Sequence, residues 1–150
     1  MPIRCEIVSQ DKTLYEDDVD IVLLPGTDGM MGILPEHAPL LTTLKYGVVQ
    51  VRKGNQEENF AVAGGVAEVQ PDLVTILADR AENVAEIDIA RAEAAQERAK
   101  EYMEQGPPLD SDRYLAMAAA LSRSNLRLDA VHRYRQSKKR ISKSSQIAEE

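Results

Sequence analysis

The chain has few of the residues from which catalytic and metal centres are built. Its 150 residues include one cysteine, Cys5, and two histidines, His37 and His132. A lone cysteine excludes an internal disulfide, fits a reducing compartment and is most simply a small buried residue. Neither histidine has a ligand cluster or a nucleophile motif beside it. We therefore expect no metal site, no required cofactor and no catalysis by this chain alone.

Long apolar runs are lacking as well. No stretch approaches the roughly 20 apolar residues that a membrane-spanning helix needs. The first six residues have neither the apolar centre of a signal peptide nor the profile of a transit peptide. We therefore expect any association with a membrane to come through a partner.

Glycine is scarce in the second half, since seven of the eight glycines lie at or before Gly65. Before that point, short runs of Val, Ile and Leu alternate with turn residues, which is typical of an antiparallel sandwich or barrel. No helix of ten residues fits between the runs, so a parallel α/β sheet is disfavoured. The expected strands are 3–10, 13–15, 19–24, 40–44, 48–53, 58–62, 66–70 and 73–78.

Strong helix formers dominate from Val84 to Gln105. After Gly106-Pro107-Pro108, a second amphipathic helix is expected, capped by Asp110 or Ser111. Its apolar residues at helical spacing are Tyr114, Met117, Ala118, Leu121, Leu128 and Val131. The sequence thus predicts an α+β chain with a β-sandwich or barrel over residues 1–83, an antiparallel helical hairpin over 84–135 and a flexible, basic tail over 136–150.

The inner face of the expected hairpin is mostly alanine. These residues are Ala90, Ala94, Ala95, Ala99, Ala116, Ala118, Ala119 and Ala120. Small side chains bury little area, at about 0.8 kcal/mol per CH₂. Strong helices with a weak seam are typical of an element with two states. A static hairpin, in which alanine only permits close packing, is the alternative.

Charged residues of the two helices share faces. Asp88, Arg91 and Arg98 fall on one face of the first helix, and Arg123 and Arg127 share a face of the second. If the helices fold back, gathered guanidinium groups need an anion, and a nucleoside triphosphate supplies bidentate acceptors. The simpler alternative is a solvated surface with local ion pairs, and spacing alone favours it. The candidate nucleotide-binding residues are Glu82, Asp88, Arg91, Arg98, Arg123 and Arg127.

The segment 24–41, LPGTDGMMGILPEHAPLL, has three glycines and three prolines among apolar residues. The glycines recur at every third residue, which suits tight turns. Each proline removes an amide donor, so the segment should lie at a sheet edge or between strands. The lysine and hydroxyl residue of a phosphate loop are missing. A rigid apolar loop of this kind is a candidate for burial against another protein.

With the next three residues, TTL, this segment resembles the signature loop of the epsilon subunit of bacterial F-type ATP synthases. AGGVAEV (63–69) and VTILAD (74–79) resemble two further blocks of that family, in order. The resemblance implies a non-catalytic central-stalk subunit of a proton-translocating ATP synthase, peripheral to the cytoplasmic face of the bacterial inner membrane. It also implies that the β domain docks on the gamma subunit and the rotor c-ring. The expected partner contacts are Gly29, Met30, Met31, Gly32, Glu36, His37, Ala38 and Pro39.

The resemblance extends to the hairpin. Residues 87–92, IDIARA, match the family segment Ile/Leu-Asp-x-x-Arg-Ala, which is associated with ATP binding by the folded hairpin in some members. It implies a regulatory ATP, and a hairpin that extends along gamma toward the catalytic alpha and beta subunits and restrains ATP hydrolysis. The tail after Arg133 is longer and more basic than is typical of the family, and the Gly106-Pro107-Pro108 joint is stiffer.

Charge leaves two other classes open. The net charge is −7, yet residues 113–143 hold nine basic side chains against one acid, Asp129. Such asymmetry suggests two modules with different partners. RYR (133–135) and KKR (138–140) are typical of phosphate contacts in a nucleic-acid-binding module, although the overall charge disfavours nucleic acid. The second alternative is a free-standing nucleotide sensor outside any complex.

Overall fold

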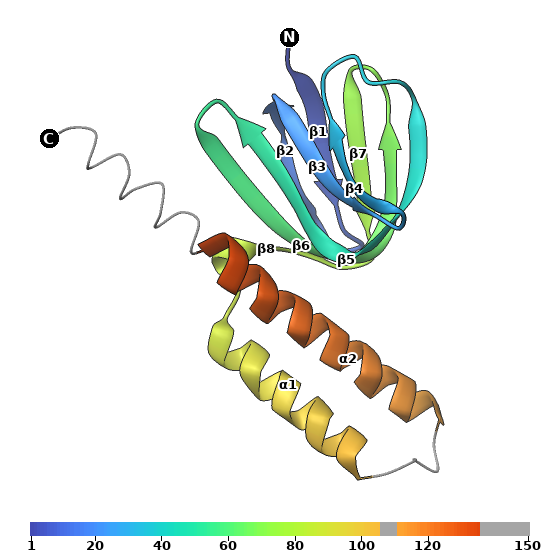
Figure 1. Ribbon diagram of the computed structural model, residues 1–150, viewed down its shortest axis with the longest axis vertical. Coiled ribbons are helices and arrows are strands. Elements are labelled where there is room, and N and C mark those ends of the chain that lie inside the picture. Colours follow the sequence, from blue (N-terminus) through green and yellow to red (C-terminus); the bar gives the residue numbers. More distant parts are fainter. Residues whose placement is uncertain (106–110, 136–150) are drawn as a thin grey trace, which may run out of the picture. The chain divides into compact units, whose positions relative to one another are not determined.

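The computed structural model describes residues 1–105 and 111–135. The chain divides into two compact units, Met1–Val84 and Ala85–Glu150. The strands lie in the first unit and both α-helices lie in the second (Figure 1). The predicted fold class, an antiparallel β-sandwich followed by a helical hairpin, is confirmed. The expected tail, the Gly106-Pro107-Pro108 joint and the Asp110 cap lie outside the described residues.

The first unit is one sheet of eight strands. Their order is β2-β1-β7-β6-β5-β3-β4, and β8 pairs with β6. Neighbours are antiparallel except β1 and β7, which run parallel. This exception to the expected antiparallel pattern is allowed because β1 and β7 are not joined by a hairpin. The strands are β1 (Ile3–Val8), β2 (Thr13–Val19), β3 (Ile21–Gly26), β4 (Gly29–Ile33), β5 (Leu40–Lys53), β6 (Gln56–Val69), β7 (Leu73–Ala78) and β8 (Ala81–Asn83).

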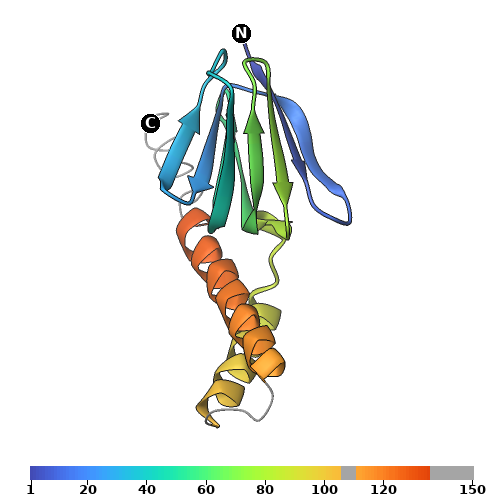
Figure 2. The ribbon, with the colours of Figure 1, turned by 90° about the vertical axis from the view of Figure 1, so that its right-hand side faces the viewer.

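The sheet folds over on itself along β5 and β6 (Figure 2). On β6, Val62 and Ala67 both belong to the buried core although they are five positions apart along the strand. Side chains of a strand alternate between its faces, so an odd spacing places these two on opposite faces of a regular strand. The change falls at Gly64 and Gly65, whose φ angles are 83° and 134°. The bend thus lets the inner faces of both halves of the sheet enclose one core.

These bends correct the predicted strand boundaries. The sequence suggests breaks after residues 44 and 62 because glycine is typical of turns. In the structure, β5 and β6 are continuous strands of 14 residues each. Gly47 of β5 gives room to Pro25 of β3, whose Cβ would lie 2.6 Å from a Cβ at position 47. Here glycine permits close approach within a strand, and the chain does not turn.

The core is formed by apolar side chains from both layers, with Phe60, Ile3, Ile7, Leu24, Ile33 and Ile76 among the largest that are fully buried. Cys5 is fully buried among them, as predicted. Burial raises the pKa of the Cys5 thiol to about 12. Tyr15 packs against Phe60 with ring centroids 5.5 Å apart. The cysteine therefore acts as a small hydrophobic residue.

The second unit is built on the helices α1 (Ile89–Glu104) and α2 (Ser111–Ala130), followed by the π-turn η2 (Val131–Arg135). A 3₁₀ turn, η1 (Val84–Glu86), precedes α1. Helix α1 therefore begins five residues later than the composition suggests. Its N-cap is Asp88, whose carboxylate accepts a hydrogen bond from the backbone N–H of Arg91 at 3.1 Å. The two helices run antiparallel, as predicted (Figure 1).

The seam of the hairpin differs from the predicted one on α1. Ala92 and Ala99 are fully buried, whereas Ala90 and Ala94 are exposed. Each helical residue turns by about 100°, so residues two positions from Ala92 project to the opposite side. On α2, the exposed Ala116 also lies off the seam, and the half-buried Tyr114, Met117, Leu121 and Leu128 occupy the spacing that the sequence predicts. Small residues of α1 thus pack against larger ones of α2.

Candidate functional site

The first part of the proline- and glycine-rich segment, through Ile33, is a β-hairpin and not a loop. Gly29, Met30, Met31 and Gly32 form most of β4, in register with β3 through the pairs Leu24↔Met31 and Gly26↔Gly29. A two-residue turn joins the strands, and Gly29 has a φ of 136°. Strand β4 ends the strand order, so the predicted sheet edge is confirmed. The strand itself was not predicted, because glycine and proline are depleted in strands.

Side chains of β4 alternate between solvent and core. Met30 is 58% exposed, while Met31 packs against the core and Ile33 is fully buried. Leu34, just after the strand, is 57% exposed. The edge therefore exposes Met30 and Leu34, and the exposed Gly32 lies between them. Met31 is half-buried and supports the strand from within, and its role as a partner contact stays a prediction.

The segment after β4 is fixed by backbone hydrogen bonds. The Glu36 N–H donates to the Pro71 carbonyl at 2.8 Å, and the His37 N–H donates to the Leu34 carbonyl at 3.2 Å. Glu36 has a φ of 65°, a left-handed conformation that is uncommon outside glycine and costs free energy. Tethered in this way, the side chain of Glu36 and those of Ala38 and Pro39 are exposed.

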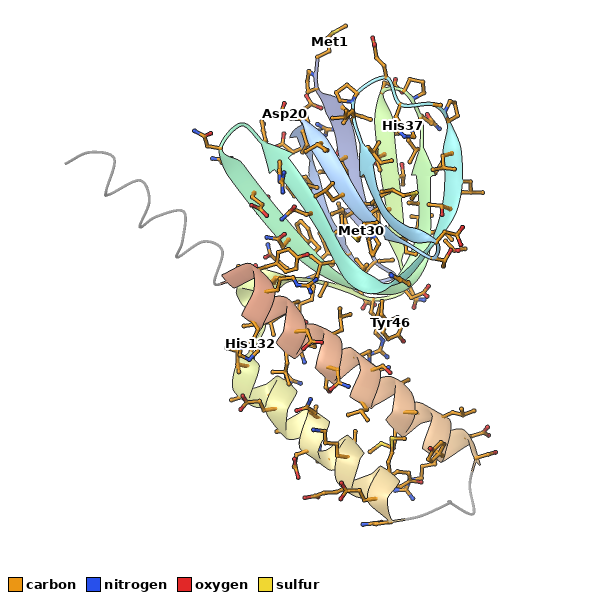
Figure 3. The ribbon with its side chains drawn as sticks, in the orientation of Figure 1. Met1, Asp20, Met30, His37, Tyr46 and His132 are labelled. Carbon is orange, nitrogen blue, oxygen red and sulfur yellow. The ribbon has the colours of Figure 1, made fainter. Side chains whose placement is uncertain are left out.

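The predicted contacts fall in two places: Gly29–Gly32 lie on the edge strand β4, and residues 36–39 lie near the β6–β7 turn, where Glu36 is bonded to Pro71. Met30 lies beside the β3–β4 turn, and His37 lies beyond the other end of β4 (Figure 3). At about 3.4 Å per residue, a strand of five residues separates its ends by about 14 Å. The imidazole Nδ1 of His37 lies 2.8 Å from the carbonyl oxygen of Ala38, a local contact of the same segment. The segment therefore offers two separate contact points and not a single loop tip.

A second exposed apolar surface was missed in the sequence. Cross-strand pairing places Val8, Leu77, Val66 and Thr43 in one row, on the face of the sheet opposite the core. Leu77 is 55% exposed, and the nearby Leu41 is 71% exposed. We call these five residues the outer apolar patch. Exposed leucine in the alternating pattern of a strand was the available signal, because an antiparallel strand with a solvated outer face normally carries polar residues there.

The acidic run of β2 is neutralised within the first unit. Lys53 donates from Nζ to both carboxylate oxygens of Asp17, at 3.0 and 3.1 Å, and this contact lowers the pKa of Asp17. The N–H of Gly54 donates to Oδ2 of Asp20 at 2.7 Å. These bonds tie the β5–β6 turn to the end of β2. In the ranges that the structure describes, no group of three His, Cys, Asp or Glu residues could bind a metal ion.

Four predicted nucleotide-binding residues lie on one flank of the hairpin. Gln96 Nε2 donates to Asn125 Oδ1 at 2.6 Å, which places these two residues at the same level on one side of the seam. With about 100° per residue, the four arginines turn to the other side of both helices. We call Arg91, Arg98, Arg123 and Arg127 the arginine flank.

The levels of these side chains also follow from the Gln96–Asn125 contact. Arg98 follows Gln96 by two residues and Arg123 precedes Asn125 by two, so the antiparallel helices bring both to one level. At 1.5 Å per residue, Arg91 and Arg127 lie within about 5 Å of each other along the helix axes, about 10 Å from Arg98 and about 6 Å from Arg123, respectively. Arg91 and Arg98 are exposed, and Arg123 and Arg127 are half-buried. Four cations gathered in this way favour a multiply charged anion.

The two predicted acidic contacts lie on different elements, and their role in nucleotide binding stays a prediction. Asp88 already caps α1 through its bond to the Arg91 N–H, a local role that its place before the helix explains. Glu82 lies on β8 of the first unit, opposite Ala61 of β6. Neither α1 nor α2 is long and apolar enough to cross a membrane, and this holds for every helix within residues 1–105 and 111–135.

Comparison with known proteins accounts for both units. Two family models match in succession: the beta-sandwich domain of the ATP synthase delta/epsilon chain over residues 2–84, and its long alpha-helix domain over residues 85–132. The ATP synthase epsilon chain of Halalkalibacterium halodurans is 40% identical over 131 residues, which cover 87% of this chain and 98% of that relative. The epsilon chain of Dehalococcoides mccartyi is 41% identical over 126 residues, or 83% and 85% of the two chains.

A solved structure shows the same arrangement of elements. A chain in the OSCP/F1/c-ring assembly of the Euglena gracilis mitochondrial ATP synthase superposes with a TM-score of 0.74 at 25% identity, over 87% of this chain and 82% of that one. The resemblance carried by the three sequence blocks is thus confirmed by matches that extend through the hairpin. This chain belongs to the ATP synthase delta/epsilon chain family.

Proposed function

We propose that the chain is a non-catalytic central-stalk subunit of a bacterial F-type ATP synthase, at the cytoplasmic face of the membrane. The observation that carries the proposal is the succession of both family domains, in order, across residues 2–132. The assembly named for the similar Euglena chain contains F1 and a c-ring. A subunit that couples gamma to the rotor ring needs rigid contact surfaces more than reactive groups, and the first unit offers two of these surfaces.

The outer apolar patch is the contact proposed for gamma. Leu41 and Leu77 are large exposed leucines on a rigid sheet, where burial against a partner removes apolar area from water. The edge formed by β4 and the following segment, with Met30, Leu34 and Glu36, is the contact proposed for the rotor c-ring. Its backbone is fixed by the Glu36–Pro71 hydrogen bond, so torque is transmitted without reordering the segment.

The arginine flank is the site proposed for a regulatory ATP. Its four guanidinium groups supply the charge and the bidentate donors that a triphosphate accepts. ATP at about 100 times its dissociation constant would stabilise the folded hairpin by about 2.7 kcal/mol. That is a large bias for a seam in which α1 contributes mainly alanine. With ATP absent, the hairpin extends toward the catalytic alpha and beta subunits and restrains hydrolysis.

Truncation tests the regulatory part of this proposal. The complex is assembled with the full chain or with a chain that ends at Gln105, and ATP hydrolysis is measured at low and high ATP. We expect faster hydrolysis with the truncated chain at low ATP, and a smaller difference at high ATP, where the hairpin stays folded. Equal rates with both chains, in complexes of equal subunit content, would refute the regulatory role.

The nucleic-acid alternative gains no specific support. Of its two basic clusters, Arg133 and Tyr134 lie in η2, and residues 138–140 lie outside the described ranges. A free-standing nucleotide sensor shares the ATP site but predicts no complex with gamma. Binding to gamma therefore separates that alternative from the stalk subunit.

A further inference from the structure

Helices that pack through small residues need something to fix their register. Ala92, Ala95 and Ala99 recur along α1 at turns of the helix, and each offers a similar shallow surface to α2. Sliding α2 by one turn, about 5.4 Å, would exchange one alanine surface for the next. Apolar packing of this kind distinguishes poorly between the two registers. In paired helices, a single polar contact often makes that distinction.

The hydrogen bond between Gln96 and Asn125 has the geometry for this task. It is 2.6 Å long, and it joins the two helices 29 residues apart in sequence. Ser124, the neighbour of Asn125, is buried in the seam and donates to the Ala120 carbonyl of its own helix at 2.9 Å. That hydroxyl thus has its partner within α2, and the amide pair supplies a polar link across the seam.

We infer that Gln96 and Asn125 are positioning residues that set the register of the hairpin and thereby align the arginine flank. The pair lies on the side of the seam opposite the arginines, so it contacts no anion bound there. The pair acts on the positions of the arginines along the helix axes. In the observed register, Arg98 and Arg123 lie at the same level, and a slip of one turn moves them about 5 Å apart. Since triphosphate oxygens are bridged by neighbouring guanidinium groups, that slip weakens anion binding. The ATP part of this inference rests on the function proposed above.

The alternative sources of register are the contact of Arg113 on α2 with the ring of Tyr102 on α1 and the connection between the helices. Helix α1 ends at Glu104 and α2 begins at Ser111. If that contact or the connection set the register, loss of the amide pair would leave both helices in place. The two explanations therefore predict different geometries for a hairpin that lacks the Gln96–Asn125 hydrogen bond.

The test uses the full chain with Cys5→Ala and nitroxide labels at Glu93→Cys and Ser122→Cys, two exposed sites at different levels of the hairpin. The distance between the labels is measured by pulsed electron resonance, and ATP binding is measured by calorimetry on unlabelled chains. Gln96→Ala should add a population displaced by about one turn and weaken ATP binding about three- to tenfold. Alanine has the higher helix propensity, so the substitution does not unwind α1. Gln105→Ala makes the same change at an exposed site away from the Gln96–Asn125 pair and should alter neither measurement.

Rescue separates positioning from a simple loss of contact. The swap of Gln96→Asn with Asn125→Gln keeps the combined length of the two amides and should restore both the single distance and the affinity. A wild-type distance in Gln96→Ala, with or without weaker ATP binding, would overturn the inference. If the wild-type chain binds no ATP, the proposed nucleotide site fails. The label distances then still test whether the Gln96–Asn125 pair sets the register. A displaced population in Gln96→Ala supports that role, and an unchanged distance refutes it.

Discussion

Gly65 is the residue at which the bend of the sandwich leaves no room for a side chain. A Cβ there would overlap the carbonyl oxygen of Leu77 on β7, and the φ of 134° is already unfavourable for other residues. Gly29 has nearly the same φ, 136°, but nothing lies within 4 Å of its Cβ position. The two glycines therefore separate the cost of conformation from the cost of overlap.

We expect Gly65→Ala to lower the free energy of unfolding of the first unit by more than about 3 kcal/mol, since strain and overlap add. Gly29→Ala, which has strain alone, should lower it by about 1–2 kcal/mol. Urea unfolding followed by circular dichroism measures both. Equal losses in the two variants would show that the bend at Gly65 tolerates a side chain.

Cys5 gives the first unit a dependence on alkaline pH. Burial raises its pKa from 9.0 to about 12, so above pH 9 the unfolded chain loses the thiol proton while the folded chain keeps it. Stability from this group is complete below pH 9 and declines as the pH rises toward 12, by at most about 1.4 kcal/mol per pH unit. Tyr15, whose pKa burial also raises to about 12, adds the same trend above pH 10.

Urea unfolding between pH 8 and 10 isolates the thiol. The wild-type free energy of unfolding should fall across this range. Cys5→Ala should be less stable at pH 8, because it leaves a cavity, yet nearly independent of pH up to 10. An identical pH slope in both proteins would contradict the assignment to Cys5.

At the scale of the element, helix α1 depends on its cap. Asp88 satisfies the Arg91 N–H, one of the donors that a helix start leaves without a partner. Asp88→Ala should destabilise α1 by about 1 kcal/mol, visible as a lower thermal midpoint of the helical circular dichroism signal. Asp88→Asn keeps a capping oxygen and should stay close to wild type. If Asn lowers the midpoint as much as Ala does, the carboxylate charge and not the cap is what matters.

Substitutions in the arginine flank should change the affinity for ATP. Arg98→Ala and Arg123→Ala each remove one guanidinium group from the shared level and should weaken ATP binding at least about tenfold, since charge-assisted bonds contribute about 1.5–3 kcal/mol. Arg113 lies near the far end of the hairpin, 5.7 Å from the ring centroid of Tyr102. Arg113→Ala is therefore the matched control and should change the affinity less than threefold in calorimetry. Similar losses in all three variants would indicate general charge attraction.

Much of this architecture is present in local sequence patterns, and its exceptions have physical causes. Alternating Val, Ile and Leu predict most strands, and proline correctly predicts the edge at β4. Glycine misleads at Gly47, because the same residue serves turns and close approach within strands. Composition identifies an alanine seam but not its phase, which depends on the start of α1 at Ile89.

The candidate sites, too, can be predicted from the sequence only in part. The arginines are visible in the sequence because each pair shares a helical face. Their common level across the seam is not visible, since it depends on which residue of α2 meets Gln96. The outer apolar patch needs the parallel pairing of Val8 with Leu77, a contact between distant segments that no local pattern specifies.

At the scale of the whole molecule, the account requires two units with different duties in one assembly. In the function proposed above, the sheet unit would bind gamma and the rotor ring, and the hairpin would respond to nucleotide. The charge is divided in the same sense, since residues 1–84 carry 6 basic and 14 acidic side chains and residues 85–150 carry 12 and 11. An extended hairpin would present residues 113–143, with nine basic side chains against one acid, to the catalytic subunits. Such attraction weakens as salt is raised.

Binding of the purified chain to the purified gamma subunit is the decisive test of the proposed stalk function. Calorimetry should show a one-to-one complex for the full chain, and Leu77→Asp should weaken it at least about tenfold by placing a charge in the outer apolar patch. Glu57→Asp, a conservative change at a half-buried position elsewhere on the sheet, should leave the affinity unchanged. The account is contradicted if the wild-type chain, folded by circular dichroism, forms no complex with gamma.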